Sequence, residues 1–208
     1  MRTLGGTTVS LVKNGYRDRY QSYLGPGKKY VEGGAYDAGK RGLTAILREN
    51  GYVLVDTGAR YVYFPVSSIS DAPDYDTTMV AYSTVTTTEV NPRFGPNENY
   101  QRVSLRLKSE YADWSVKDLW ATFGGSYEVA EALEDRVISV HLQSGTPVKV
   151  FFEMNGWVYA EFEEELVGLL RAWIPATQVS GHNNTLQKKN SYNNSNIDVC
   201  AAEYEFIY

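Results

Sequence analysis

The eight residues YLGPGKKY, from Tyr23 to Tyr30, have a counterpart seventy positions later in RFGPNENY, from Arg93 to Tyr100. Each stretch has an aromatic or aliphatic residue, then Gly-Pro, three mostly polar residues and a final tyrosine. Gly-Pro is a common turn, so this match alone is weak. It decides the fold only if further matches follow it in the same order in both parts of the chain.

Two further pairs of stretches do follow in that order. RENGYVLVDT (48–57) pairs with EMNGWVYAEF (153–162), and RYVYFPVSSI (60–69) pairs with RAWIPATQV (171–179). The Asn-Gly pairs predict hairpin turns, because glycine accepts a positive φ. The prolines predict strand ends, since proline cannot donate a hydrogen bond to a ladder. Three ordered matches predict an internal repeat of a small β-rich unit.

The second copy is longer than the first. The spacing from Gly-Pro to Asn-Gly is 24 residues in the first copy and 59 in the second. The excess is close in length to the segment 113–136, which reads as helical because Val116, Leu119, Trp120 and Phe123 share one helix face. Ser115 is the expected N-cap, or Asp113 with a looser fit.

Gly124-Gly125 should end this first helix. Ser126 is then positioned to cap a second helix, with Val129 and Leu133 as its inner face. The apolar face of the insert must be buried. It would either cap a ligand groove of the second copy or pack against the first copy and lock the two together, and we favour locking.

On these residues each copy resembles a bacterial SH3 (SH3b) domain. The second copy carries most of the resemblance, at Arg93, Gly95, Pro96, Tyr100, Asn155, Gly156, Trp157, Trp173, Ile174, Pro175 and Val179. The first copy departs from the pattern at Tyr23, Leu24, Tyr52 and Phe64. The resemblance implies a mainly β fold of two tandem SH3-like small barrels, the second with a short helical insert.

The expected organisation follows from the repeat and from the linker composition. We expect a first SH3b-like domain at 1–70, an acidic and Pro-broken linker at 71–78, and a second domain at 79–180. The remainder, 181–208, reads as a polar tail with a possible final strand.

Composition excludes some classes of partner. The formal net charge is −5, which argues against non-specific nucleic-acid binding. No apolar run reaches the length of a membrane span. The N-terminus lacks the continuous apolar core of a signal peptide. The single cysteine, Cys200, excludes an intrachain disulfide and a Cys-rich metal site.

The sequence offers little catalytic chemistry. His141 lies in a predicted strand and His182 in the Asn-rich tail, and Cys200 follows both instead of preceding a histidine. The acidic stretch at 161–165 suggests paired carboxylates, but a charged hairpin tip explains it more simply. We therefore expect no enzyme activity, no cofactor and no metal.

Aromatic residues dominate the expected binding surface. The chain has 17 tyrosines, and tyrosine combines an apolar ring with a polar tip. The resemblance implies ligand contact by the first long loop and the central hairpin of each copy. The candidate ligand-binding residues are Tyr30, Tyr36, Tyr52 and Tyr63 in the first copy and Tyr100, Trp157, Tyr159 and Trp173 in the second.

The implied function is a non-catalytic module that attaches a bacterial envelope protein or wall hydrolase to peptidoglycan or its peptides. It implies an extracellular or cell-envelope location, with an adjacent catalytic domain as one possible partner. Two alternatives stay open: a structural or adhesion module that binds a protein partner, and a fragment of a cell-wall hydrolase with an unrecognised site.

Overall fold

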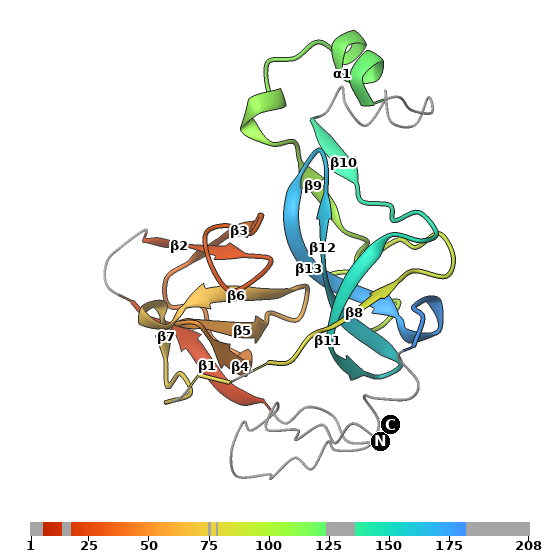
Figure 1. Ribbon diagram of the computed structural model, residues 1–208. Coiled ribbons are helices and arrows are strands. Elements are labelled where there is room, and N and C mark those ends of the chain that lie inside the picture. The colour runs from red at the N-terminus through yellow and green to blue at the C-terminus, as the bar shows by residue number, and fades with distance from the viewer. Residues whose placement is uncertain (1–5, 14–17, 75, 78, 124–135, 182–208) are drawn as a thin grey trace.

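The computed structural model describes residues 6–13, 18–74, 76–77, 79–123 and 136–181 of the 208-residue chain. These residues form a mainly β structure of antiparallel sheets with one α-helix, which confirms the predicted class. Figure 1 shows strands β1–β7 and strands β8–β13 as two groups side by side. We call residues 6–77 the first half and residues 79–181 the second half.

The first half forms one seven-stranded sheet in the order β3-β2-β6-β5-β4-β1-β7. Its strands are β1 (Thr7–Leu11), β2 (Arg19–Tyr23), β3 (Glu32–Asp37), β4 (Leu43–Glu49), β5 (Tyr52–Asp56), β6 (Tyr61–Pro65) and β7 (Ile69–Ser70).

The second half forms a four-stranded sheet, β13-β12-β11-β8, and a two-stranded sheet, β10-β9. Its strands are β8 (Tyr82–Val85), β9 (Ser104–Arg106), β10 (Val137–Ser139), β11 (Pro147–Met154), β12 (Trp157–Glu164) and β13 (Gly168–Pro175). Within the described residues none of the three sheets closes into a barrel. The coarse fold class is therefore confirmed, while the two small barrels stay a prediction.

The two Asn-Gly pairs form the tight turns that the sequence predicts. Asn50 and Asn155 have φ of 51° and 55°, and the glycine after each also has positive φ. Two consecutive positive φ values match the twist of a two-residue hairpin. The turns join β4 to β5 and β11 to β12.

In both halves the last long strand ends at a proline. Pro65 ends β6 and Pro175 ends β13, and each is followed by a short 3₁₀ helix, η1 (Val66–Ser68) or η3 (Ala176–Gln178). In both halves the residue after the proline donates its N–H to the glycine of the Asn-Gly turn, at 3.0 Å and 2.8 Å. The equivalent local structures support the internal repeat.

The Gly-Pro turns are equivalent in the same detail. The N–H of the residue after each Gly-Pro pair, Gly27 or Asn97, donates to the carbonyl of the glycine in that pair. The N–H of the tyrosine then donates to the carbonyl of Gly27 or Asn97. The tyrosine ring then lies over the glycine. A Cβ added at Gly25 would come within 2.1 Å of Tyr30, and one at Gly95 within 2.3 Å of Tyr100. Glycine is needed here because the ring occupies the space of a side chain.

The predicted linker is attached to the first half by polar contacts. The Nε of Arg48 lies 2.6 Å from Asp76, and its Nη1 donates to the carbonyl of Pro73 at 2.9 Å. The other carboxylate oxygen of Asp76 accepts the N–H of Gly51 at 3.1 Å. The acidic chain after β7 therefore folds back onto the first Asn-Gly hairpin.

The helical insert begins as the sequence predicts. Ser115 accepts the N–H of Asp118 at 3.1 Å, so it is the N-cap of α1 (Val116–Phe123), whose Leu119 is buried. Figure 1 shows α1 beyond β9 and β10, far from the strands of the first half, so α1 does not lock the halves together. The predicted second helix, with Ser126, Val129 and Leu133, lies outside the described residues, as do His182, Cys200 and the final strand.

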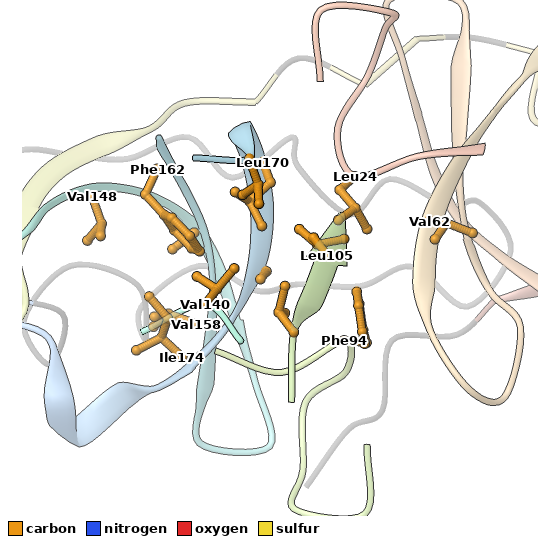
Figure 2. Close-up of a cluster of buried hydrophobic side chains, with 14 of the residues drawn as sticks. Leu24, Val62, Phe94, Leu105, Val140, Val148, Val158, Phe162, Leu170 and Ile174 are labelled. Atoms are coloured by element: carbon orange, nitrogen blue, oxygen red, sulfur yellow. The ribbon is translucent and has the colours of Figure 1, made fainter. Parts of the chain in front are cut away.

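One apolar cluster extends through both halves. It includes residues of the first half such as Leu24 and Val62 and residues of the second half such as Leu105 and Leu170. Figure 2 shows Leu24 and Leu105 at the point where the cluster passes from one half to the other. Burial across this boundary removes apolar surface from water and holds the halves together.

Candidate functional site

Each Gly-Pro turn touches the last long strand of the opposite half. The N–H of Tyr61, on β6, donates to the carbonyl of Phe94 at 2.8 Å. The N–H of Arg171, on β13, donates to the carbonyl of Leu24 at 2.6 Å. Leu24 and Phe94 hold equivalent positions before the two Gly-Pro pairs, so the contact is reciprocal. We call this contact, between the two Gly-Pro turns and strands β6 and β13, the junction.

The two repeat tyrosines take part in the junction in the same reciprocal way. Tyr30 donates its hydroxyl to Glu161 on β12 at 2.6 Å, and Tyr100 donates its hydroxyl to Asp56 on β5 at 3.2 Å. Asp56 and Glu161 each lie four residues after the aromatic that follows an Asn-Gly turn. Each half therefore supplies a tyrosine to a carboxylate of the other half.

Arg171 is at the centre of the junction. It is 4% exposed, and its guanidinium donates to Glu49 at 2.7 Å and to Glu161 at 3.0 Å. It also donates to the hydroxyls of Tyr63 at 3.2 Å and Tyr30 at 3.3 Å. Since Glu49, Tyr63 and Tyr30 belong to the first half, one arginine side chain joins both halves in a buried ion network.

Electrostatics keep this network charged. Burial favours the neutral form of Arg171, but the neighbouring Tyr63 and Glu49 outweigh it and raise the pKa of the guanidinium. Burial also acts to raise the pKa of Glu161, but the hydrogen bonds from Tyr30 and Arg171 outweigh it, and the pKa of Glu161 is lowered. The pair therefore stays ionised at neutral pH.

The repeat tyrosines should make the protein sensitive to alkaline pH. Burial, with the hydrogen bond to Glu161, raises the pKa of Tyr30 to about 12. Burial, with the charge of Asp56, raises the pKa of Tyr100 to about 12. A pKa that is raised on folding favours the protonated native state, so this stability is fully present below pH 10 and is lost as the pH rises towards 12.

Urea unfolding at pH 8, 10 and 11 measures that loss. The Tyr30→Phe/Tyr100→Phe double variant should lose less stability over this range than the wild type, because its two rings no longer titrate. An equal loss in both proteins would contradict the assigned pKa values.

The structure places the eight candidate ligand-binding residues in two different environments. Tyr30, Tyr63, Tyr159 and Trp173 are buried, and Tyr36, Tyr52, Tyr100 and Trp157 are half-buried. The first group lies in or beside the junction, where Trp173 stacks edge-on against Tyr61 at 5.2 Å. Tyr63, Tyr159 and Trp173 are covered in this way and line no groove described below, whereas Tyr30 is buried at the edge of one.

A groove of about 1050 Å³ lies along the boundary of the two halves, on the side of Tyr30. Its lining comes from β2 and β3 of the first half, from the chain around β9, and from the turn between β12 and β13. We call it the basic groove. Its lining residues are Arg19, Gln21, Lys29, Tyr30, Val31, Glu32, Gly34, Ala35, Arg60, Ser104, Leu105, Arg106, Leu107, Lys108, Ser109, Glu163, Val167, Gly168 and Leu169.

The floor of the groove is a direct contact between the halves. The N–H of Val31 donates to the carbonyl of Leu169 at 2.9 Å, next to the Tyr30–Glu161 hydrogen bond. The groove is therefore formed by both halves together, and it depends on the junction for its shape.

The groove is positively charged, although the chain as a whole is acidic. Its lining holds five basic side chains and two carboxylates. The basic residues are Arg19, Lys29, Arg60, Arg106 and Lys108, and the acidic residues are Glu32 and Glu163. Concentrated charge of one sign in a concave site attracts ligands of the opposite sign.

Some of these cations have partners and others are available. Arg19 is 3.2 Å from Asp37 at an exposed position, and the half-buried Lys108 is 4.0 Å from the exposed Glu110. Ion pairs that are open to solvent are weak. Among the described residues no carboxylate lies within ion-pairing distance of Arg106, whose side chain is exposed. Arg106 is therefore the strongest candidate for contact with an anionic ligand.

The sequence of this wall of the groove carries a pattern of its own, separate from the repeat motifs. In SLRLK (104–108) leucine alternates with polar or basic residues. Alternation with period two puts Leu105 and Leu107 on the buried face and Ser104, Arg106 and Lys108 on the other. What the sequence could not show is that the first half adds Lys29, Arg19 and Arg60 across the same groove.

The described residues hold neither a metal-binding cluster nor a helix that could span a membrane. No three His, Cys, Asp or Glu side chains among them come together in a way that would hold a metal ion. No helix in that part of the chain has the length and hydropathy needed to cross a membrane.

Comparison with known proteins gives little further information. No protein-family model matches the chain, and no curated protein matches it. Among solved structures the chain is similar to NlpC1 and NlpC2 from Trichomonas vaginalis, each at 10% identity over 86% of this chain, with TM-scores of 0.30 and 0.29. The chain spans about half the length of those structures, 47% and 49%. Similarity at this level does not assign a function.

Proposed function

We propose that this chain is a non-catalytic binding module, and that its ligand is peptidoglycan or a peptide of the cell wall. The observation that carries the proposal is the basic groove, a concave site of about 1050 Å³ built by both halves. A groove of that volume falls at the upper end of the sizes typical of ligand sites. Its arginines and lysines suit carboxylate groups, which they bind through charge-assisted hydrogen bonds.

The chemistry of the groove favours binding over catalysis. The described residues that line it include no histidine or cysteine, and the carboxylates Glu32 and Glu163 are both exposed. His141 lies elsewhere, with Nδ1 at 3.0 Å from Asn91 and Nε2 at 3.5 Å from Glu89. Arginine and lysine at neutral pH hold anions and do not readily act as proton acceptors.

The choice of a cell-wall ligand rests on the SH3b resemblance of the two repeats together with the groove charge. Wall peptides carry free carboxylates, which a positively charged groove accommodates. This role places the protein at the cell envelope or outside the cell, joined to other wall proteins or to a catalytic domain.

A second candidate is an adhesion module that binds a protein partner through the insert. Trp114 and Trp120 are 36% and 39% exposed, and exposed tryptophan is typical of protein interfaces. Trp114 packs on Tyr111 at 5.2 Å, so this aromatic surface is partly ordered by its own contacts.

Retention on purified peptidoglycan tests the first proposal. The wild-type chain should sediment with protein-free sacculi in a saturable way, and 0.3 M NaCl should weaken retention because the contacts are ionic. The Arg106→Glu/Lys108→Glu variant should lose at least about tenfold in affinity, since each change replaces attraction by repulsion.

The matched control is Lys117→Glu, a charge reversal at an exposed lysine of α1 outside the groove. It should bind as the wild type does. Equal retention of the groove variant and the control would show that the groove is not the site. No retention of the wild type on any wall preparation would contradict the peptidoglycan function, and lysis of the sacculi would favour the hydrolase alternative.

A further inference from the structure

Among the described residues strand β9 has an unpaired edge at Ser104–Arg106, and this edge lies in the basic groove. It ends at Lys108, whose N–H donates to the carbonyl of Leu166 at 2.9 Å. Within the described residues β9 pairs with β10 alone. Six consecutive residues, Ser104 to Ser109, line the groove, so the strand runs along its wall instead of crossing it. A free strand edge beside a cavity offers a row of backbone donors and acceptors.

The register shows which backbone groups are available. Val140 donates to the carbonyl of Val103, and Leu107 donates to the carbonyl of Arg136, so the Val103 carbonyl and the Leu107 N–H face β10, while the Val103 N–H donates to Pro92. In an antiparallel ladder alternate residues direct these groups to opposite sides. The N–H and C=O groups of Ser104 and Arg106 therefore face away from β10, and no bond to them is present among the described residues.

Basic side chains lie on both sides of this edge. Arg106 and Lys108 come from the strand and the residues after it, and Arg19, Lys29 and Arg60 come from the first half. Arg60 is held in place by a hydrogen bond to the carbonyl of Gly33 at 3.3 Å and by stacking on Phe94 at 4.2 Å. The edge is thus surrounded by positive charge from two directions.

From the free edge and the charge together we infer that the groove binds a short acidic peptide in extended conformation, as an additional strand beside β9. The peptide backbone would pair with Ser104 and Arg106, and its carboxylates would contact Arg106, Lys108 and the basic side chains of the first half. Strand addition of this kind takes affinity from the backbone ladder and specificity from alternate side chains. The inference rests on the proposed binding role and names the ligand class for the same site.

The backbone edge distinguishes a peptide from other anions. A polyphosphate or an anionic glycan would satisfy the arginines and lysines, but would not form a ladder with Ser104 and Arg106. The groove floor also offers Val31 and Leu169, both half-buried, to apolar side chains of a peptide. A hexapeptide that alternates glutamate and valine, blocked at both ends, is therefore a suitable probe.

The test measures fluorescence anisotropy of the labelled Glu/Val hexapeptide together with amide hydrogen exchange of the full chain. The peptide should bind, and the amides of Ser104 and Arg106 should become at least about tenfold more protected. A Lys/Val peptide of the same length should bind at least about tenfold more weakly. A peptide N-methylated at alternate positions should also lose at least about tenfold in affinity, because it cannot complete the ladder.

The Ser104→Pro variant blocks the edge in the protein itself. Proline removes an N–H that faces away from β10, so the β9–β10 ladder keeps its bonds. This variant should fold with a near-wild-type melting temperature and bind the peptide at least about tenfold more weakly. If it fails to fold, the N-methylated peptide supplies the same test on the wild-type protein.

Three outcomes would overturn the inference: no binding of the acidic peptide, binding without protection of the Ser104 and Arg106 amides, or equal affinity for the N-methylated peptide. Its failure is distinguishable from failure of the wall-binding proposal. Retention on sacculi without peptide binding would support the wall-binding proposal and contradict the strand-addition site. Peptide binding without retention on sacculi would support the strand-addition site and indicate that the acidic peptide comes from a source other than the cell wall.

Discussion

Replacing Arg171 with methionine is expected to lower the free energy of unfolding by about 3 to 5 kcal/mol. The guanidinium is 4% exposed, while Glu49 and Glu161 are 8% and 9% exposed. Methionine keeps much of the side-chain volume but leaves Glu49 buried without a counter-charge and Glu161 with only the exposed Lys149, 3.7 Å away. Removing one partner of a buried ion network costs far more than the network contributes when it is complete.

Urea or thermal unfolding of the purified variant, followed by tryptophan fluorescence, measures this loss. The matched control is Arg19→Met, because Arg19 pairs with Asp37 at an exposed position, 3.2 Å away. That substitution should change stability by less than about 1 kcal/mol. In the triple variant Arg171→Met/Glu49→Gln/Glu161→Gln much of the loss should be recovered. A triple variant that is as unstable as Arg171→Met would show that uncompensated charge is not the cause.

The Gly25→Ala substitution is expected to cost about 2 to 4 kcal/mol, although it adds a single methyl group. Its Cβ would lie 2.1 to 2.5 Å from three atoms of the Tyr30 ring. The ring must then move out of the junction and release its 2.6 Å hydrogen bond to Glu161. Gly95→Ala should cost less, because Tyr100 is half-buried and its bond to Asp56 is longer, at 3.2 Å.

A double-mutant cycle separates this explanation from a general loss of backbone freedom. If the clash with the ring is the cause, Gly25→Ala/Tyr30→Ala should be no less stable than Tyr30→Ala alone, since no ring remains to displace. Simple addition of the two single losses would contradict the clash and would indicate a different role for Gly25.

Local features of this fold were predictable because they depend on a few neighbouring residues. Asn50-Gly51 and Asn155-Gly156 form the expected hairpins, Pro65 and Pro175 end strands, and Ser115 caps the helix. Each of these depends on backbone conformations that one or two side chains determine.

The site was not predictable in the same way, because it depends on how the two halves pack. An aromatic residue such as Trp173 or Tyr63 is equally typical of a ligand groove and of a core. Both are buried here by contacts with residues more than a hundred positions away in the sequence. Arg171 looked like an ordinary strand residue, and its role appears only when Glu49 of the other half is placed beside it. The basic groove was missed for the same reason, since its two walls come from opposite halves.

The reciprocal contact at the junction has the character of a homodimer interface within a single chain. In a two-fold dimer, residue i of one subunit contacts j of the other, and j contacts i, so any substitution changes the interface twice. Here the equivalent positions are encoded separately and hold different residues, as at Tyr61 and Arg171 or at Asp56 and Glu161. One side of the contact holds the ion network of Arg171, and the other holds the edge-on ring pair of Tyr61 and Tyr100, with centroids 5.7 Å apart. A dimer of identical subunits cannot encode this asymmetry.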